Sequence, residues 1–220
     1  MNEGKEYNYT KEHKKEVLVL NESSYHQLIP GIGKRLEQVF GCKVYTQNKN
    51  LDSFFREWEV SGWYHLDTAG VQNEIGALNM PVLAITDKVL ALKIREFCYE
   101  LPCGFAMEDK VCSISLASID KNITEMPISL SYVAEFVAVH EVGHLVINPA
   151  HHRPAKYVTP GSLEVESGAH CPNPDCLMQG QGDFIERLIQ KKKLGFSEDF
   201  WLCRPCKLAI KPGFNDYYFR

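Results

Sequence analysis

Apolar and polar positions alternate in blocks along the first two thirds of the chain. Residues 16–20 (EVLVL) and 81–87 (PVLAITD) are continuous apolar runs of strand length, whereas residues 125–147 keep an apolar pattern long enough for a helix. We therefore predict strands at 16–20, 42–47 and 81–87, with two more inside 98–119, and helices at 24–41, 67–78, 125–147 and 183–195. Strands that alternate with helices favour an α/β layer structure.

Proline, glycine and capping residues predict several boundaries of helices and loops. The PGIG segment at 30–33 predicts that the first helix starts near Gly33, and Gly41 should end this helix. Asp67 is placed to cap the helix at 67–78. Residues 149–183 contain many Pro, Gly, His and Cys residues and are predicted to be loop.

Composition and charge narrow the class of protein. The chain has 220 residues, 45% of them hydrophobic and 24% charged, with a formal net charge of -4. This length suits one well-buried domain with a small appendage, and the charge gives no reason to expect a nucleic-acid or anionic-membrane partner. The polar leader at 1–15 lacks the apolar core of a signal peptide, and no run approaches the roughly 20 apolar residues of a membrane span. We expect a cytoplasmic protein, monomeric by default.

The longest predicted helix carries the motif HEVGH at its end. His140 and His144 lie four residues apart and share one helix face, so both imidazoles can bind the same metal ion. Glu141 is rotated by about 100° around the helix axis and can act on a metal-bound water without being a ligand. This geometry is typical of zinc peptidases.

A hydrolytic zinc needs a third protein ligand, and the positions just after the motif do not offer it clearly. In the metzincin pattern of zinc peptidases a glycine and the third ligand follow the second histidine by three and six residues, but these positions hold Ile147 and Ala150 here. Ile147 is β-branched and disfavours the positive φ that a turn at such a glycine uses. His151 and His152 follow on an exit segment of uncertain direction and remain candidates.

A stronger candidate lies downstream. His170 directly precedes a C-x4-C pair, which is followed two residues later by a methionine. Glu164 and Glu166 are a further alternative, because some HExxH peptidases take a downstream glutamate as the third ligand. That reading leaves the motif around His170 without a role.

Cysteine spacing predicts a second metal site. The chain has eight cysteines and no visible secretion signal, which indicates a reducing compartment in which paired cysteines more often bind metal than form disulfides. Four of them form two close pairs with the spacing of a tetrahedral zinc site, and Arg204 and Lys207 are placed to offset its negative charge. The predicted thiolate ligands are Cys171, Cys176, Cys203 and Cys206.

Taken in order, these motifs resemble those of the archaemetzincins. The family signature runs HExxHxxGxxHC, then a further Cys and a Met, and later CxxC. This chain carries HEVGH at 140–144, HCPNPDCLM at 170–178 and CRPC at 203–206, and the resemblance extends from about residue 16 to 213. It implies an α/β, metzincin-like zincin in which a mixed twisted sheet packs on helices, including the HExxH helix, beside a small zinc-clamped C-terminal subdomain.

The resemblance also implies roles for individual residues. His140, His144 and His170 would bind a catalytic zinc, Glu141 would be the general base, and Met178 would form the methionine turn beneath the metal. The four cysteines would bind a second, structural zinc. The chain departs from the family because 25 residues separate His144 from His170. Clamping of Cys171 by the structural zinc would hold the adjacent His170 in place despite this insertion.

The expected domain organisation and function follow. We expect a leader at 1–15, an α/β subdomain at 16–147 that ends in the active helix, and a C-terminal subdomain at 148–220 with an inserted loop at about 148–169. The expected activity is hydrolysis of peptide bonds in a peptide or protein substrate, by zinc-activated water with Glu141 as general base. A zinc-stabilised binding protein of the same fold, non-catalytic or self-occluded, is the alternative.

Overall fold

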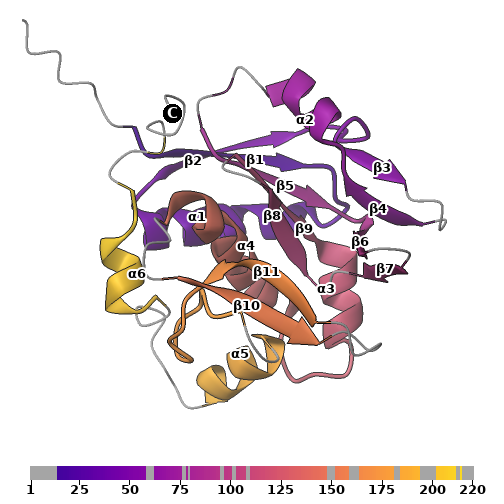
Figure 1. Cartoon of the computed structure of the whole chain (residues 1–220). Coiled ribbons are helices and arrows are strands. Elements are labelled where there is room, and N and C mark those ends of the chain that lie inside the picture. The colour runs from indigo at the N-terminus through magenta and orange to yellow at the C-terminus, as the bar shows by residue number, and fades with distance from the viewer. Residues whose placement is uncertain are drawn as a thin grey trace, which may run out of the picture.

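The protein is described here by a computed structural model, which covers residues 14–57, 62–75, 78, 80–94, 97–100, 103–107, 110–147, 152–158, 164–180, 184–193, 202–211 and 214. A central sheet lies between two layers of helices and shorter strands (Figure 1). In chain order the elements are β1 (Glu16–Asn21), a 3-10 turn (His26–Leu28), α1 (Ile29–Phe40), β2 (Lys43–Asn48), β3 (Phe55–Glu57), β4 (Trp63–Leu66), α2 (Thr68–Ile75), β5 (Val82–Thr86), β6 (Val89–Ile94), β7 (Phe97–Glu100), β8 (Gly104–Met107), β9 (Val111–Ser115), α3 (Leu116–Ile123), α4 (Leu130–Val146), β10 (Arg153–Val158), β11 (Glu164–His170), α5 (Phe184–Lys193) and α6 (Arg204–Leu208).

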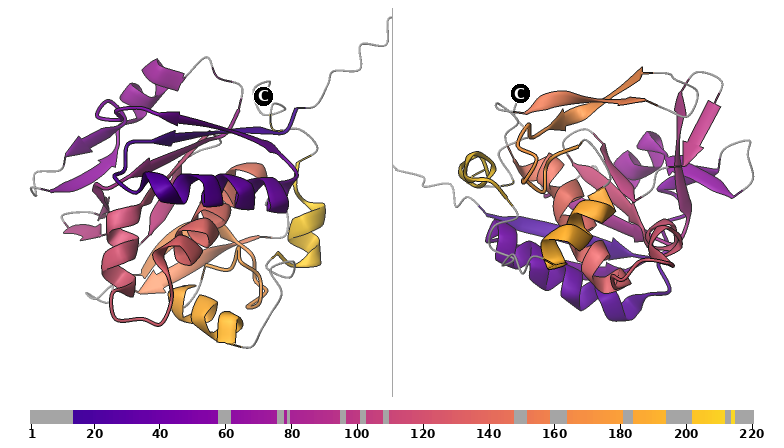
Figure 2. Two further views of the ribbon diagram at one scale, coloured as in Figure 1. Left: turned by 180° about the vertical axis from the view of Figure 1, so that it is seen from behind. Right: turned by 90° about the horizontal axis from the view of Figure 1, so that it is seen from below.

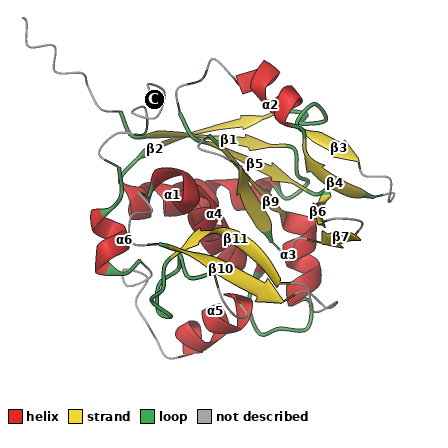
Figure 3. Ribbon diagram, viewed as in Figure 1, coloured by secondary structure: helices red, strands yellow, loops and turns green. Residues whose placement is uncertain are grey.

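The central sheet has the strand order β2-β1-β5-β9-β8. Its first four strands are parallel, and β8 pairs antiparallel with β9 at the edge. A second sheet, of order β3-β4-β6-β7, lies beside it with α2, as Figure 3 shows by its colouring. The structure is therefore mixed α/β, as the alternation of elements in the sequence predicts.

Both faces of the central sheet are buried. Val17 and Val19 of β1 join the core formed with α1 and α4, whereas Leu20 joins the core formed with α2 and the second sheet. Leu83 and Val82 of β5 divide between the two cores in the same way. Side chains alternate between faces along a strand, so continuous apolar runs are expected where both faces are covered.

The helix α4 runs through the centre of the molecule. It begins after Ser129, whose side chain accepts a hydrogen bond from the Tyr132 N–H, and most of its side chains are buried. At its end Ile147 is extended, with φ -97° and ψ 127°, and pairs with Ile210 in an isolated bridge. Lys211 donates from its backbone N–H to Val146 O and from Nζ to Leu145 O, which satisfies carbonyls that the helix end leaves free.

The segment after α4 forms a hairpin and two short helices. Strands β10 and β11 pair antiparallel, with Arg153 opposite His170 and a register shift after Pro154. The hairpin and α1 lie on opposite sides of α4 (Figure 2). None of the helices in the described part of the chain is both long enough and apolar enough to cross a membrane.

Three sequence predictions about elements were wrong. The first helix starts at Ile29 and not near Gly33, because Pro30 occupies its first turn, where a missing N–H costs nothing. The segment 98–119, expected to be a strand, a loop and a second strand, contains β8 where the loop was expected, and its last strand stops at Ser115, which caps α3 by accepting from Ser118 N. The predicted loop at 149–183 contains the β10–β11 hairpin.

Candidate metal centres

Two imidazoles of α4 face each other. His140 and His144 lie one helical turn apart, and their Nε2 atoms are 3.2 Å from each other. The ring of His140 is oriented by a 2.8 Å hydrogen bond from Nδ1 to the carbonyl oxygen of Leu177, so Nδ1 carries the proton and Nε2 offers its lone pair. The i, i+4 spacing and this outer hydrogen bond give the pair the orientation of two metal ligands.

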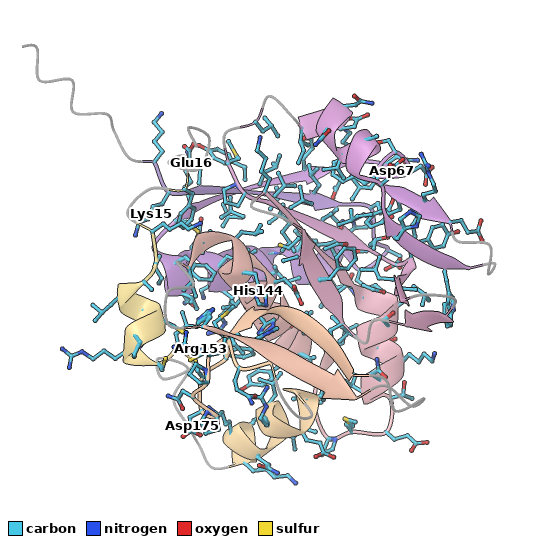
Figure 4. The ribbon with its side chains drawn as sticks, in the orientation of Figure 1. Lys15, Glu16, Asp67, His144, Arg153 and Asp175 are labelled. Carbon is cyan, nitrogen blue, oxygen red and sulfur yellow. The ribbon has the colours of Figure 1, made fainter. Side chains whose placement is uncertain are left out.

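The third imidazole comes from the end of the hairpin. His170 closes β11, and its ring centroid lies 5.4 Å from that of His140 and 4.7 Å from that of His144. One ring nitrogen from each of the three histidines lies within 4.8 Å of the others. Figure 4 labels His144 at the end of α4, beside the hairpin that carries His170.

The other candidates for the third zinc ligand either lie outside this histidine group or have side chains that the structure does not describe. His152 is buried, but it is not in this group, and its Nε2 contacts Cys206 Sγ at 3.3 Å instead. His151 lies outside the described residues. The backbones of Glu164 and Glu166 belong to β11, and their side chains are not described.

The spacing of the histidine nitrogens fits zinc. Zinc–nitrogen bonds of about 2.0–2.1 Å in a tetrahedral site place two ligand nitrogens about 3.3 Å apart. The 3.2 Å between the Nε2 atoms of His140 and His144 agrees with this value. Three neutral imidazoles are also a known ligand set of catalytic zinc, which keeps a fourth position open.

Burial controls the protonation of the site. It lowers the pKa of His140 to about 4, and nearby His170 and His152 lower it further, against the opposing effect of the Leu177 carbonyl. Burial and the same kind of histidine neighbours hold the pKa of His144 well below its usual value. Neutral imidazole is the form that binds metal, so both rings are ready for a ligand role at neutral pH.

Glu141 is buried on the same helix, with 7% of its surface exposed. Burial raises the pKa of its carboxyl to about 8. A carboxyl with a pKa near neutrality can accept a proton and release it again at physiological pH. The position therefore suits a general base more than a permanently charged ligand.

The turn that contains Met178 packs against α4. Met178 is fully buried, and its carbonyl oxygen accepts from the N–H of Cys171 at 2.9 Å. It packs against Gly143 so closely that a Cβ added there would meet Met178 Sδ at 2.4 Å. The same turn supplies the Leu177 carbonyl that orients His140.

The four cysteines form the second group. Their sulfur atoms all lie within 4.8 Å of one another, with 3.6 Å between Cys171 and Cys203 and 3.5 Å between Cys176 and Cys206. None of the four is in a disulfide. Zinc–sulfur bonds of about 2.3 Å place tetrahedral sulfur ligands about 3.8 Å apart, so the spacing fits a structural zinc.

The loop around these sulfurs favours the thiolate form of Cys176, whereas burial raises the pKa of Cys171. Asn173 accepts hydrogen bonds from the N–H groups of Asp175 and Cys176, which closes a tight turn between the first two cysteines. The backbone N–H of Cys203 points at Cys176 Sγ at 3.4 Å. Hydrogen bonding with Cys206 lowers the pKa of Cys176 to about 5, and zinc binds the thiolate form.

Two contributors to the sites were not predicted from the sequence. His152 was considered only as a zinc ligand, and nothing in its spacing indicates the contact with Cys206, 54 positions away. Gly180 was not singled out, although a Cβ there would meet the ring of His170 at 2.3 Å. The glycine-rich sequence MQGQG after Met178 was the available signal for close backbone approach.

A surface hollow of about 400 Å³ lies away from both groups. It is lined near the ends of β1 and β5 by residues such as Glu22 and Lys88, and by none of the candidate ligands. Lys88 Nζ is already paired with Glu22 Oε1 at 2.6 Å and Asp52 Oδ1 at 3.1 Å. These contacts account for its polar lining.

Comparison with known proteins gives a result for structure but none for sequence. No protein-family model matches the chain, and no curated protein matches it significantly. A zinc-dependent peptidase from Methanocorpusculum labreanum aligns with a TM-score of 0.52 and 14% identity over 88% of this chain and 98% of its own. The archaemetzincin from Methanopyrus kandleri aligns with a TM-score of 0.52 and 12% identity over 91% and 95%. The archaemetzincin from Archaeoglobus fulgidus, complexed with malonate, aligns with a TM-score of 0.53 and 15% identity over 89% and 99%. The resemblance indicated by the motifs is thus confirmed at the level of the fold, and this chain is built like an archaemetzincin.

Proposed function

We propose that the protein is a zinc-dependent peptidase whose catalytic zinc is bound by His140, His144 and His170. The observation that carries the proposal is the convergence of three ring nitrogens within 4.8 Å, next to a buried glutamate. Its fold is shared with zinc-dependent peptidases of known structure, which supports the same assignment.

Glu141 is the proposed general base. The three imidazoles would hold a zinc with one open position, at which the metal would lower the pKa of a bound water and polarise a carbonyl oxygen. Glu141 accepts the proton of the attacking water and then donates it to the leaving nitrogen of the scissile amide. Burial raises the pKa of this carboxyl in the zinc-free chain, and the positive charge of a bound zinc would favour the carboxylate that the base role requires.

The second proposed zinc is structural and is bound by Cys171, Cys176, Cys203 and Cys206. It fixes the turn that contains Met178 and, through Cys171, the backbone of His170. This support replaces the short glycine turn that the chain lacks after His144, where Ile147 is extended. The proposed substrate is a peptide or protein.

Substitution of Glu141 tests the chemistry. Glu141→Gln keeps the shape of the side chain but cannot accept the proton, so cleavage of an internally quenched peptide library should fall by about 10²–10⁴-fold. Zinc content, measured by elemental mass spectrometry, should stay at two ions per chain. Glu125→Gln, an exposed position just before α4, serves as the matched control and should retain full activity.

The outcome separates this proposal from a non-catalytic binding protein. Two zinc ions with cleavage lost only in Glu141→Gln support the peptidase. Equal cleavage by Glu141→Gln and wild type would remove Glu141 from the mechanism. A single tightly bound zinc together with no cleavage of any library peptide would favour a zinc-stabilised binding protein.

A further inference from the structure

His152 is a buried histidine that the proposed mechanism does not use. It directly precedes β10, and only 6% of its surface is exposed. Its Nε2 lies 3.3 Å from Sγ of Cys206, which is itself fully buried. The residue before the hairpin is therefore in contact with Cys206, the last cysteine of the cluster.

This contact is a hydrogen bond to a ligand and not a further metal bond. The group of donor atoms within 4.8 Å of one another contains the four sulfurs and leaves His152 out. The histidine group also leaves it out. A ring nitrogen 3.3 Å from one sulfur is at the distance of an N–H···S hydrogen bond.

A buried zinc with four thiolates has a net charge of -2 and needs donors around its sulfurs. The basic side chains expected to supply them, Arg204 and Lys207, are exposed on α6. His152 places a buried ring nitrogen 3.3 Å from the sulfur itself. We propose that His152 is a positioning residue that donates from Nε2 to Cys206 Sγ, stabilises the sulfur-bound zinc and anchors the inserted hairpin to it.

The open end of the hairpin, where β10 begins and β11 finishes, is then held to the cysteine cluster through both strands. Its second strand runs into His170 and Cys171, and its first strand begins one residue after His152. Arg153 pairs with His170 across the two strands, so the anchor at His152 acts on the backbone of the third proposed ligand. This inference rests on the sulfur-bound zinc of the proposed function.

The test is the retention of zinc by variants of the full-length, zinc-loaded chain. His152→Leu removes the donor and keeps a buried apolar group, and it should weaken retention of the sulfur-bound zinc by about 10–100-fold, as loss of an outer hydrogen bond to a metal ligand typically does. His152→Gln restores an N–H donor and should recover most of that loss. Lys34→Ala, which removes an exposed charge from α1 and none from the segments that carry the cysteines, is the control and should behave as wild type.

Two measurements read the effect without relying on peptidase activity. Competition with a chromogenic chelator gives the affinity and rate of release for each zinc, and amide hydrogen exchange reports protection of the hairpin strands. His152→Leu should release the slower zinc faster and lose protection in β10, whereas His152→Gln should lose little of either. If the leucine variant does not fold, His152→Phe, which keeps a ring without a donor, takes its place.

Each remaining outcome counts against the inference. Wild-type zinc retention in His152→Leu would overturn it, as would equal losses in the leucine and glutamine variants, because the hydrogen bond would then have no effect. A wild-type chain without a slowly released zinc would overturn the proposed sulfur site and this inference with it. Two zinc ions, unchanged in every His152 variant, would overturn the inference alone.

Discussion

Two glycines make room for side chains of the proposed catalytic centre. Gly143 on α4 lies against Met178, and Gly180 lies against the ring of His170. An added Cβ at Gly180 would meet three ring atoms of His170 between 2.3 and 2.6 Å, far inside van der Waals contact. The position of the His170 ring therefore depends on the lack of a side chain at residue 180, ten positions later.

We expect Gly180→Ala to displace the His170 ring and weaken the zinc bound by the histidines by about 10–100-fold, a typical cost of disturbing the groups that orient a ligand. The sulfur-bound zinc should be unaffected, so chelator titration should show one weakened site and one unchanged site. Gly33→Ala on α1 is the matched control, since a Cβ there meets Val44 at an ordinary 3.5 Å. Identical titrations for Gly180→Ala and wild type would show that the ring tolerates the added methyl group.

At the scale of elements, α4 depends on a partly buried ion pair with α1. Arg35 donates from Nε and Nη2 to Glu135 Oε2 at 3.1 Å, and its guanidinium lies 5.1 Å from the centre of the Phe136 ring. Glu135 also accepts from Ser131. These contacts fix the helix that carries the histidine pair against the rest of the core.

Glu135→Ala should lower the free energy of unfolding by about 2–3 kcal/mol, because it leaves Arg35 without its charged acceptor in a site where its side chain is only 12% exposed. Urea denaturation of the zinc-loaded protein measures this change. Glu74→Ala, which breaks the more exposed pair with Lys49, should cost much less. Equal costs for the two substitutions would mean that burial adds nothing to the Arg35–Glu135 pair.

Sequence patterns predicted the elements of the central layers because local periodicity and caps decide them. The strands around Val19 and Leu83 and the long helix through His140 are predominantly apolar, and this pattern is readable without knowing their partners. The hairpin was missed because residues 153–158 and 164–170 have no alternation of apolar and polar residues. The described contact at its start joins His152 to Cys206, 54 positions away, and leaves no local pattern to read.

The metal ligands were predictable to different degrees. Helical spacing alone indicates His140 and His144, while the position of His170 had to be inferred from the cysteine beside it. The contact of His152 with Cys206 arises from tertiary packing across 54 residues and leaves no local signal. The roles of these residues remain proposals, and so does the two-part division of the chain at residue 148.

For the whole molecule, the buried carboxyl of Glu141 makes the stability of the zinc-free protein depend on pH. Its pKa is raised from 4.5 to about 8, so between these values the folded state keeps a proton that the unfolded state has released. Stability therefore falls as pH rises through this window, by about 1.4 kcal/mol per pH unit. The uncharged Glu141→Gln variant lacks this loss.

We expect the zinc-free Glu141→Gln variant to be more stable than the wild type by a few kcal/mol at about pH 7.5, and to lose most of that advantage at about pH 5. Both proteins contain His140 and His144, whose lowered pKa values make stability fall with acidity in each, so their effect cancels in the difference. Urea unfolding of chelator-treated protein across this range measures it. Parallel pH curves for the two proteins would contradict a buried, neutral Glu141.

His170 is followed directly by Cys171 in the chain, so the length of the insertion before it does not set the position of its ring. When an imidazole is anchored from its carboxyl side and by its cross-strand pairing with Arg153, the residues between these two points can be lengthened, shortened or exchanged without moving it. Chains that share this arrangement are therefore free to vary in size between residues 154 and 169, and this stretch can gain new surface features beside an unchanged set of proposed metal ligands.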